Sequence, residues 1–346
     1  MRQFRACWSC GGLAAIFLVA QILFILYWHQ REAKQTWHAV QISHRSSSRE
    51  KVRFTDKPAS LLEIQMQRKQ KLLAACADPN FTFPGKNWDY DEIPKREFGS
   101  FIAIDNVKLV YCAVPKVACS NWKRVLAIVS NSTVYKDLAH LPPGIEHGLF
   151  DKWKSDKDLK TFVQLRLDTH KTFIFVRHPF VRLISLFRNK FESPNSYVFH
   201  HVARMLRLYG NVSNIPENSK KLFEMGIKPT FTHFIQYLLD PKNEKGFFNI
   251  HWRQVYQICH PCQIDYDFIG KIETMDKDIT YLMNLLNLKV AFQFPSKYQS
   301  ATTNNLLRKY FGDVPINLIE KLYKLYEPDF VLFGYSRPQF LYDEAK

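Results

Sequence analysis

Hydrophobic and polar positions alternate with two different periods between residue 96 and the C-terminus. Two apolar runs rich in β-branched and aromatic residues, Val107–Val114 and Thr172–Val176, predict buried strands. Each run is followed by apolar residues at helical spacing, over Asn121–Val129 after the first run and over Pro179–Glu192 after the second. The same spacing predicts further helices over Ser196–Tyr209, Thr230–Leu239, Lys277–Leu288, Thr303–Phe311 and Ile316–Tyr326. This alternation favours an α/β domain with a central parallel sheet flanked by helices, in which ligands gather at the carboxyl ends of strands.

The N-terminal region has a different pattern. Residues 11–28 carry no formal charge, and 18 residues are long enough to cross a bilayer. We predict a cytosolic tail over residues 1–10 and a transmembrane signal anchor over residues 11–28, with type II orientation. A cleaved signal peptide is the alternative, but the apolar stretch is long and lacks a clear A-x-A-like cleavage site.

Residues 29–95 show little strand pattern and scattered basic residues. We predict a lumenal stem there, ahead of a catalytic domain over residues 96–346. Within the stem, apolar positions at helical spacing over Leu61–Ala75 could form an amphipathic helix, and its self-association would make the protein a homo-oligomer. A solvated tether with transient helix is the simpler interpretation.

Charge and composition narrow the class of partner. The 346 residues are 46% hydrophobic, which is enough for a full core, and 48 basic against 32 acidic residues give a net charge of +16. Such a field attracts polyanions. Three Asn-x-Ser/Thr sequons, at Asn80, Asn131 and Asn211, are glycosylation sites only in the secretory lumen. We therefore expect an acidic glycan as partner, and no nucleic acid.

The seven cysteines divide unevenly. Cys7 and Cys10 fall on the predicted cytosolic tail, and the other five would lie in an oxidising lumen, where an odd number leaves at least one without an intrachain partner. The spacing of Cys259 and Cys262 resembles half of a zinc site, but the sequence has no second ligand pair at zinc spacing. We therefore predict no metal, a structural loop or a local disulfide at these two residues, and a core position for Cys112.

Two polar segments follow the predicted strands. The segment that begins Pro115-Lys116 leads from the first strand into a helix, whose N-terminal N–H groups could hold an anion beside the Lys116 charge and the Ser120 hydroxyl. The glycines of a Walker loop are absent, which argues against a P-loop kinase. After the second strand, Arg182 and Ser185 stand three apart on a helix, so one phosphate could meet a guanidinium and a hydroxyl together.

These segments resemble sulfotransferase motifs: P-K-x-x-x-[ST]-x-W-K resembles the 5′-phosphosulfate loop, and R-x-P-x-x-R-x-x-S the 3′-phosphate motif. Further motifs are similar to those of Golgi carbohydrate sulfotransferases of the HNK-1 and chondroitin/dermatan 4-O-sulfotransferase group. They include Arg188-Asn189-Lys190-Phe191, Cys259-His260-Pro261-Cys262 and the run Asp329–Tyr335, and the resemblance covers roughly residues 96 to 340.

This resemblance implies a P-loop-like sulfotransferase fold, a single-pass Golgi membrane enzyme and 3′-phosphoadenosine 5′-phosphosulfate (PAPS) as donor. The expected reaction places sulfate on position 4 of N-acetylgalactosamine in chondroitin or dermatan. The glucuronic acid of the HNK-1 epitope and terminal N-acetylgalactosamine of N-glycans are alternative acceptors. An inactive glycan-binding protein is an alternative of another class, against which intact Lys116, Arg177 and Ser185 argue.

The resemblance also assigns roles to residues. Lys116 would contact the leaving oxygen, backbone N–H groups of Val117–Asn121 would hold the 5′-phosphate, and Arg177 and Ser185 would hold the 3′-phosphate. The donor-binding residues are predicted to be Pro115, Lys116, Val117, Ala118, Cys119, Ser120, Asn121, Arg177, His178, Pro179, Phe180, Val181, Arg182, Leu183, Ile184 and Ser185.

A general base must take the acceptor proton, and the resemblance points to His251 within Phe248-Asn249-Ile250-His251-Trp252, a segment similar to a recurrent F-N-x-H-W feature of the group. Glu273 is the rival base, and an ion pair with Lys271 is its structural alternative. Sulfuryl transfer does not need a metal.

Overall fold

The computed structural model describes residues 60–341 apart from 136, 139, 143, 150–158, 244–247, 289–302 and 340. These residues belong to one compact unit, Ala59–Lys346. The predicted cytosolic tail, the predicted transmembrane segment over 11–28 and the first part of the predicted stem lie outside the described residues. No helix within the described part of the chain is both long enough and apolar enough to cross a membrane.

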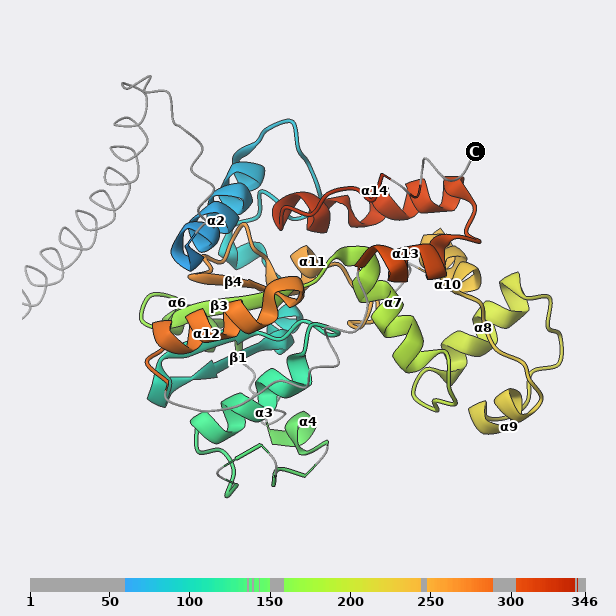
Figure 1. The fold of residues 1–346 in the computed structure, drawn as a ribbon, viewed down its shortest axis with the longest axis horizontal. Coiled ribbons are helices and arrows are strands. Elements are labelled where there is room, and N and C mark those ends of the chain that lie inside the picture. Colours follow the sequence, from blue (N-terminus) through green and yellow to red (C-terminus); the bar gives the residue numbers. More distant parts are fainter. Residues whose placement is uncertain are drawn as a thin grey trace, which may run out of the picture. The chain divides into compact units, whose positions relative to one another are not determined.

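A four-stranded sheet forms the centre of one half of the unit (Figure 1). Its strands lie side by side in the order β1 (Phe101–Ile104), β2 (Leu109–Cys112), β3 (Lys171–Val176) and β4 (Phe268–Lys271). The strands predicted from the two apolar runs are confirmed as β2 and β3. Strands β2, β3 and β4 are parallel, but β1 runs antiparallel to β2, so the prediction of a parallel sheet is wrong at this edge. The reason is the short turn Asp105–Val107, which can join only antiparallel neighbours.

Helices cover the sheet and build the other half of the unit (Figure 1). The seven predicted helices that follow the first strand are confirmed as α3, α7, α8, α10, α12, α13 and α14, with small shifts at most ends and a longer α14, which continues through Pro328. The α-helices among the described residues are α2 (Leu61–Ala77), α3 (Cys119–Val129), α4 (Ile145–Leu149), α6 (Leu159–Leu167), α7 (Pro179–Lys190), α8 (Phe199–Tyr209), α9 (Ser219–Glu224), α10 (Phe231–Leu239), α11 (Val255–Cys259), α12 (Met275–Leu285), α13 (Thr303–Phe311) and α14 (Ile316–Leu332).

Two hydrophobic cores stabilise the two halves. The first core surrounds the sheet, where the rings of Tyr111 and Phe173 stack 4.5 Å apart and Trp122 of α3 packs edge-on against Phe173. The second core is formed by α7, α8, α10, α13 and α14 around side chains such as Phe180 and Phe234. Helix α7 begins at the carboxyl end of β3 and packs in the second core, so it connects the sheet with the helical half.

Helix α2 corrects the interpretation of its segment as a solvated tether. It begins with a capping box between Ser60 and Glu63, and it buries Leu72 and Ala75 in the first core. A disulfide joins Cys76 near its C-terminal end to Cys262. The predicted helix is therefore present, but it is a packed part of the same compact unit as the sheet.

The cysteine pairing also differs from the prediction. Cys112 pairs with Cys259, and Cys76 pairs with Cys262, so the local disulfide between Cys259 and Cys262 does not form and Cys112 is not a simple core thiol. His260 lies between them in the left-handed conformation and turns the chain, so that the two sulfurs meet different elements. Cys119 is the free cysteine within the described part of the chain. This confirms that the five downstream cysteines leave one without an intrachain partner.

Candidate active site

The loop between β2 and α3 has an unusual backbone. Lys116 and Ala118 have φ angles of 71° and 61°, in the left-handed region that residues other than glycine rarely adopt. Val117 between them is fully buried and anchors the loop. Left-handed residues of this kind occur in backbone nests, in which successive N–H groups point toward a bound anion. Each strained residue costs on the order of 1–3 kcal/mol, and such strain is concentrated at functional sites.

A cavity of about 280 Å³ opens between this loop and one face of α7. The predicted site residues that line it are Lys116, Arg177, Val181, Ile184 and Ser185. The structure thus brings residues from the two separate segments together at the carboxyl ends of β2 and β3, as predicted. The other predicted residues of α7 do not line this cavity: Phe180 and Leu183 belong to the second hydrophobic core, and Pro179 is buried at the first turn.

Arg182 corrects the prediction that it shares a phosphate with Ser185. Its side chain is 1% exposed and does not line the cavity. The guanidinium donates to the backbone carbonyls of Pro115 (Nε to O, 3.3 Å) and Arg253 (Nη1 to O, 3.0 Å). Arg182 therefore fixes the position of the strained loop from within the protein. Burial raises the pKa of the Asp329 carboxyl to about 6, and the charge of Arg182 opposes this rise.

Positive charge dominates the cavity. The ammonium of Lys116 donates to Asn189 Oδ1 at 2.9 Å, an acceptor that carries no charge. The pKa of Lys116 is lowered to about 8, mainly by burial; Cys119 opposes the shift, and the nearby cations Lys190 and Arg177 contribute to it. Glu192 is an acidic residue of the lining, and its Oε1 accepts a hydrogen bond from the Tyr310 hydroxyl at 2.6 Å. Cations held close together in this way favour a ligand with several negative charges.

The two predicted bases lie outside the cavity lining. His251 is half-buried, with its ring edge-on to that of Tyr197 and its backbone N–H donating to Asn249 Oδ1 at 3.0 Å. Its role as base stays a prediction. Glu273 does not pair with Lys271: its carboxylate accepts from the His178 backbone N–H and from the Tyr335 hydroxyl.

His178 and the first turn of α3 complete the account of the predicted donor residues. His178 is the N-cap of α7, and its ring lies among the rings of Phe180, Phe330 and Tyr335. Burial lowers its pKa to about 4, so this histidine is neutral at physiological pH. Cys119 opens α3, followed by Ser120 and Asn121, and all three are partly exposed.

Sequence reasoning missed part of the cavity wall, which also includes Arg188, Asn189, Glu192 and Leu306. The signal was helical spacing: counted from Val181, positions 184, 185, 188 and 192 share one face of a helix. Of the predicted glycosylation sites, Asn80, Asn131 and Asn211 all have exposed side chains. Among the described residues, no group of three or more His, Cys, Asp or Glu side chains could hold a metal ion.

Comparisons with known proteins show the family to which this chain is similar. The model of the sulfotransferase family matches residues 99–336, which include the loop and all of α7. The chain is 43% identical to carbohydrate sulfotransferase 12 of Mus musculus over 289 residues, which are 80% of this chain and 69% of that protein. It is 33% identical to carbohydrate sulfotransferase 8 of Mus musculus over 81% of this chain and 65% of that protein. Carbohydrate sulfotransferase 11 of Rattus norvegicus is 35% identical over 68% of this chain and 66% of that protein.

No solved structure matches the chain. The range matched by the family model includes the strained loop, the residues that line the cavity and the four strands of the sheet. The chain therefore belongs to the sulfotransferase family, as an enzyme of its carbohydrate O-sulfotransferase group.

Proposed function

We propose that this enzyme transfers a sulfuryl group from PAPS to a hydroxyl of a glycan. The observation that carries the proposal is the cavity in which Lys116, Arg177 and Ser185 meet, beside a loop in which Lys116 and Ala118 adopt the left-handed conformation. A donor with a 5′-phosphosulfate and a 3′-phosphate offers two anionic groups to these cations. The printed names of the relatives support a carbohydrate acceptor.

Each residue has a defined task in this proposal. The N–H groups of the loop and of the first turn of α3 hold the 5′-phosphosulfate. Arg177 and Ser185 hold the 3′-phosphate, while buried Arg182 fixes the loop. During transfer the bond between sulfur and the donor phosphate oxygen breaks, and a bond forms between sulfur and the acceptor oxygen. The Lys116 ammonium stabilises the charge on the departing phosphate of 3′,5′-ADP. The proton of the acceptor hydroxyl passes to a base, for which we propose His251.

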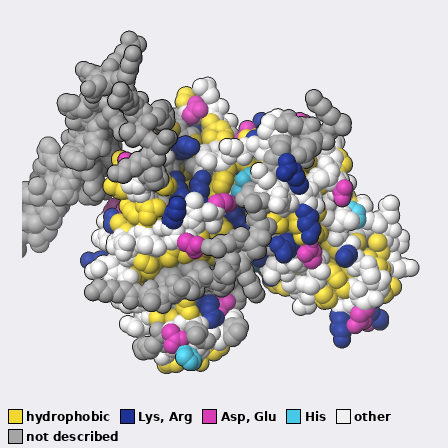
Figure 2. Space-filling model, viewed as in Figure 1, with side chains coloured by type: hydrophobic (Ala, Val, Ile, Leu, Met, Phe, Trp, Pro, Cys, Tyr) yellow, Lys and Arg dark blue, Asp and Glu magenta, His cyan; other side chains and the backbone are white. Residues whose placement is uncertain are grey.

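We propose position 4 of N-acetylgalactosamine in chondroitin or dermatan as the acceptor, with HNK-1 glucuronic acid and terminal N-acetylgalactosamine as alternatives. A net charge of +16 suits an acidic polymer. Figure 2 shows Lys and Arg side chains spread over the visible face, interspersed with fewer acidic ones. Donor motifs carry no information about the acceptor, so the acceptor must be found by assay.

We also propose that the catalytic unit lies in the Golgi lumen, tethered by residues 11–28, and carries glycans on the three exposed asparagines. Both disulfides of the described residues suit that oxidising compartment. Digestion of the protein from mammalian cells with an N-glycosidase is expected to reduce its apparent mass. Unchanged mass would contradict glycosylation.

The direct test incubates the full-length protein in detergent with radiolabelled PAPS and a panel of desulfated chondroitin, dermatan, glucuronyl-lactosamine and terminal N-acetylgalactosamine acceptors. Disaccharide analysis then locates the label. We expect sulfate at position 4 of N-acetylgalactosamine in chondroitin or dermatan. Label on another acceptor would keep the reaction and change the substrate, and donor binding without transfer to any of them would contradict the proposed activity on this panel.

A further inference from the structure

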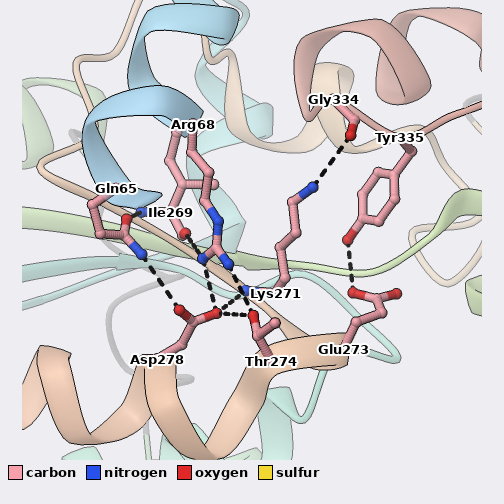
Figure 3. Close-up of polar contacts among 9 residues, drawn as sticks. All are labelled: Gln65, Arg68, Ile269, Lys271, Glu273, Thr274, Asp278, Gly334 and Tyr335. Atoms are coloured by element: carbon pink, nitrogen blue, oxygen red, sulfur yellow. Dashed lines mark hydrogen bonds and ion pairs between the residues drawn. The ribbon is translucent and has the colours of Figure 1, made fainter. Parts of the chain in front are cut away.

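The carboxylate of Glu273, just after β4, joins two segments that are distant in the sequence. Its Oε1 accepts a hydrogen bond from the backbone N–H of His178 at 2.8 Å, and its Oε2 accepts one from the hydroxyl of Tyr335 at 2.9 Å, the latter drawn in Figure 3. His178 is the N-cap of α7 and directly follows Arg177. The carboxylate therefore fixes the backbone next to the point from which the Arg177 side chain leaves β3.

Tyr335 is itself held on several sides. The ammonium of Lys271 lies 4.0 Å from the centre of its ring and also approaches the Gly334 carbonyl oxygen, at 3.4 Å. The ring of His178 meets it edge-on, with centroids 5.6 Å apart. Lys271 ends β4 and is paired in register with Val176, the last residue of β3. The ends of β3 and β4 and the segment after α14 thus meet at this tyrosine.

The segment that carries Glu273 is rigidly supported. Asp278 of α12 accepts hydrogen bonds at one oxygen, Oδ2, from the Lys271 backbone N–H (2.8 Å), the Thr274 hydroxyl (2.6 Å) and the Arg68 guanidinium (2.8 Å), as drawn in Figure 3. Glu273 therefore stands between two residues, Lys271 and Thr274, that the same buried carboxylate fixes. A side chain on such a support can set the position of the element it contacts.

Electrostatics indicate where the Arg177 guanidinium lies relative to this support. Burial raises the pKa of Tyr335 well above its usual value, Glu273 adds to the rise, and the charge of Arg177 opposes it. The same charge helps to lower the pKa of Lys116, after the larger effect of burial. Arg177 thus lies within electrostatic reach of both Tyr335 and Lys116, and it lines the cavity.

We infer that Glu273 is a positioning residue for the donor: by holding the His178 N–H and the Tyr335 hydroxyl, it orients Arg177 toward the 3′-phosphate. This inference rests on the proposed function. It also replaces the interpretation of Glu273 as a general base, because both of its oxygens accept from protein donors and its side chain does not line the cavity.

The test compares two nucleotides that differ only in the 3′-phosphate. Isothermal titration calorimetry measures the affinity of the full-length protein for 3′,5′-ADP and for 5′-AMP. Glu273→Ala removes the carboxylate that accepts these two hydrogen bonds. We therefore expect this variant to bind 3′,5′-ADP about 10- to 100-fold more weakly than the wild type. Binding of 5′-AMP is expected to change less than about 2-fold, because it has no group for Arg177 to hold.

Conservative variants separate positioning from general damage. Glu273→Gln keeps an amide oxygen for the His178 N–H and an NH₂ group for the Tyr335 oxygen, so it is expected to restore most of the preference for 3′,5′-ADP. Tyr335→Phe removes one of the two hydrogen-bond donors to Glu273 and is expected to weaken the preference for 3′,5′-ADP by a few-fold. In kinetics, Glu273→Ala should raise the donor KM far more than it lowers kcat.

Asp240→Ala is the matched control. Asp240 also accepts from a backbone N–H, that of Lys242, at one oxygen and from a tyrosine hydroxyl, that of Tyr209, at the other, but it lies at the end of α10. This variant should keep the wild-type ratio of the two affinities. A wild-type protein without preference for 3′,5′-ADP would contradict the proposed function. A wild-type preference that Glu273→Ala retains would overturn the inference alone. If Glu273→Ala does not fold, an unchanged ratio in Tyr335→Phe overturns it.

Discussion

Two polar regions of this enzyme differ in the partners that they give to a positively charged side chain. In the network of α2 and α12, the Arg68 guanidinium meets the Asp278 carboxylate at 2.8 Å, the Thr274 hydroxyl and the Ile269 carbonyl (Figure 3). In the cavity, the Lys116 ammonium meets the uncharged amide of Asn189, and neighbouring cations help to lower its pKa.

The difference separates structural from functional charge. Arg68 and Asp278 neutralise each other inside the protein. On the outer side of β4, the Gln65 amide oxygen accepts from the backbone N–H of Ile269, and Arg68 donates to its C=O. In the cavity, the Lys116 ammonium is hydrogen-bonded to a neutral amide, at a cost in stability, and can still pair with an anion that comes from outside. A charged residue is therefore assigned to function or to stability by its partners and not by its burial alone.

The largest expected effect concerns the neutralised pair. Asp278→Ala leaves the Arg68 guanidinium, whose side chain is 10% exposed, without its carboxylate, so we expect the free energy of unfolding to fall by about 3–5 kcal/mol. Urea denaturation measures it. The matched control is Asp265→Ala, whose exposed pair with Lys69 should contribute no more than about 1 kcal/mol. Equal losses in both variants would contradict the comparison.

The cavity should respond in the opposite way. Lys116→Ala is expected to lower kcat on the order of 100- to 1,000-fold, because it removes the charge that we propose stabilises the leaving phosphate. Its free energy of unfolding should not fall, since the folded protein disfavours this ammonium, as its lowered pKa shows. Lys171→Ala, at the opposite end of β3, is the control and should keep wild-type activity. Full activity of Lys116→Ala would refute the mechanism.

A smaller effect should appear with pH. The pKa of Lys116 is lowered to about 8, so its ammonium is charged below pH 8 and loses its proton above it. Affinity for 3′,5′-ADP should therefore be highest below pH 8 and fall above it, by up to about tenfold per pH unit. Calorimetry between pH 6.5 and 9.5 measures this. Lys116→Arg should flatten the fall, because a guanidinium keeps its proton, whereas Lys171→Arg should follow the wild type.

Hydrophobic period was sufficient to predict β2, β3 and α7, because their apolar residues are continuous or regularly spaced in the sequence. It could not decide which side of α7 faces the cavity. Arg182 and Ser185 are neighbours on a helix, but the boundary between core and cavity runs between them. That boundary depends on how α7 packs against α13 and α14, which local sequence does not encode.

Contacts between distant residues were the other limit. Cys112 and Cys259 are 147 positions apart, and Cys76 and Cys262 are 186 apart, so spacing gave no guide to their pairing. The apolar positions at helical spacing in the α2 segment include Leu72, which is buried, and Leu62, Met66 and Leu73, which are exposed, so spacing alone did not show that the helix packs on the sheet. Its attachment depends on polar side chains, Gln65 and Arg68, whose partners lie about 200 residues downstream.

The downstream position of those partners delays the docking of α2 during synthesis. A ribosome completes α2 about 200 residues before Ile269 and Asp278 emerge, and at roughly 5–20 residues per second this delay lasts on the order of 10–40 s. During that time α2 has neither its ion-pair partner nor Cys262. Helix α2 is thus synthesised early, but it can form these contacts only late in synthesis. Nascent chains truncated before residue 262 should therefore leave Cys76 accessible to thiol reagents.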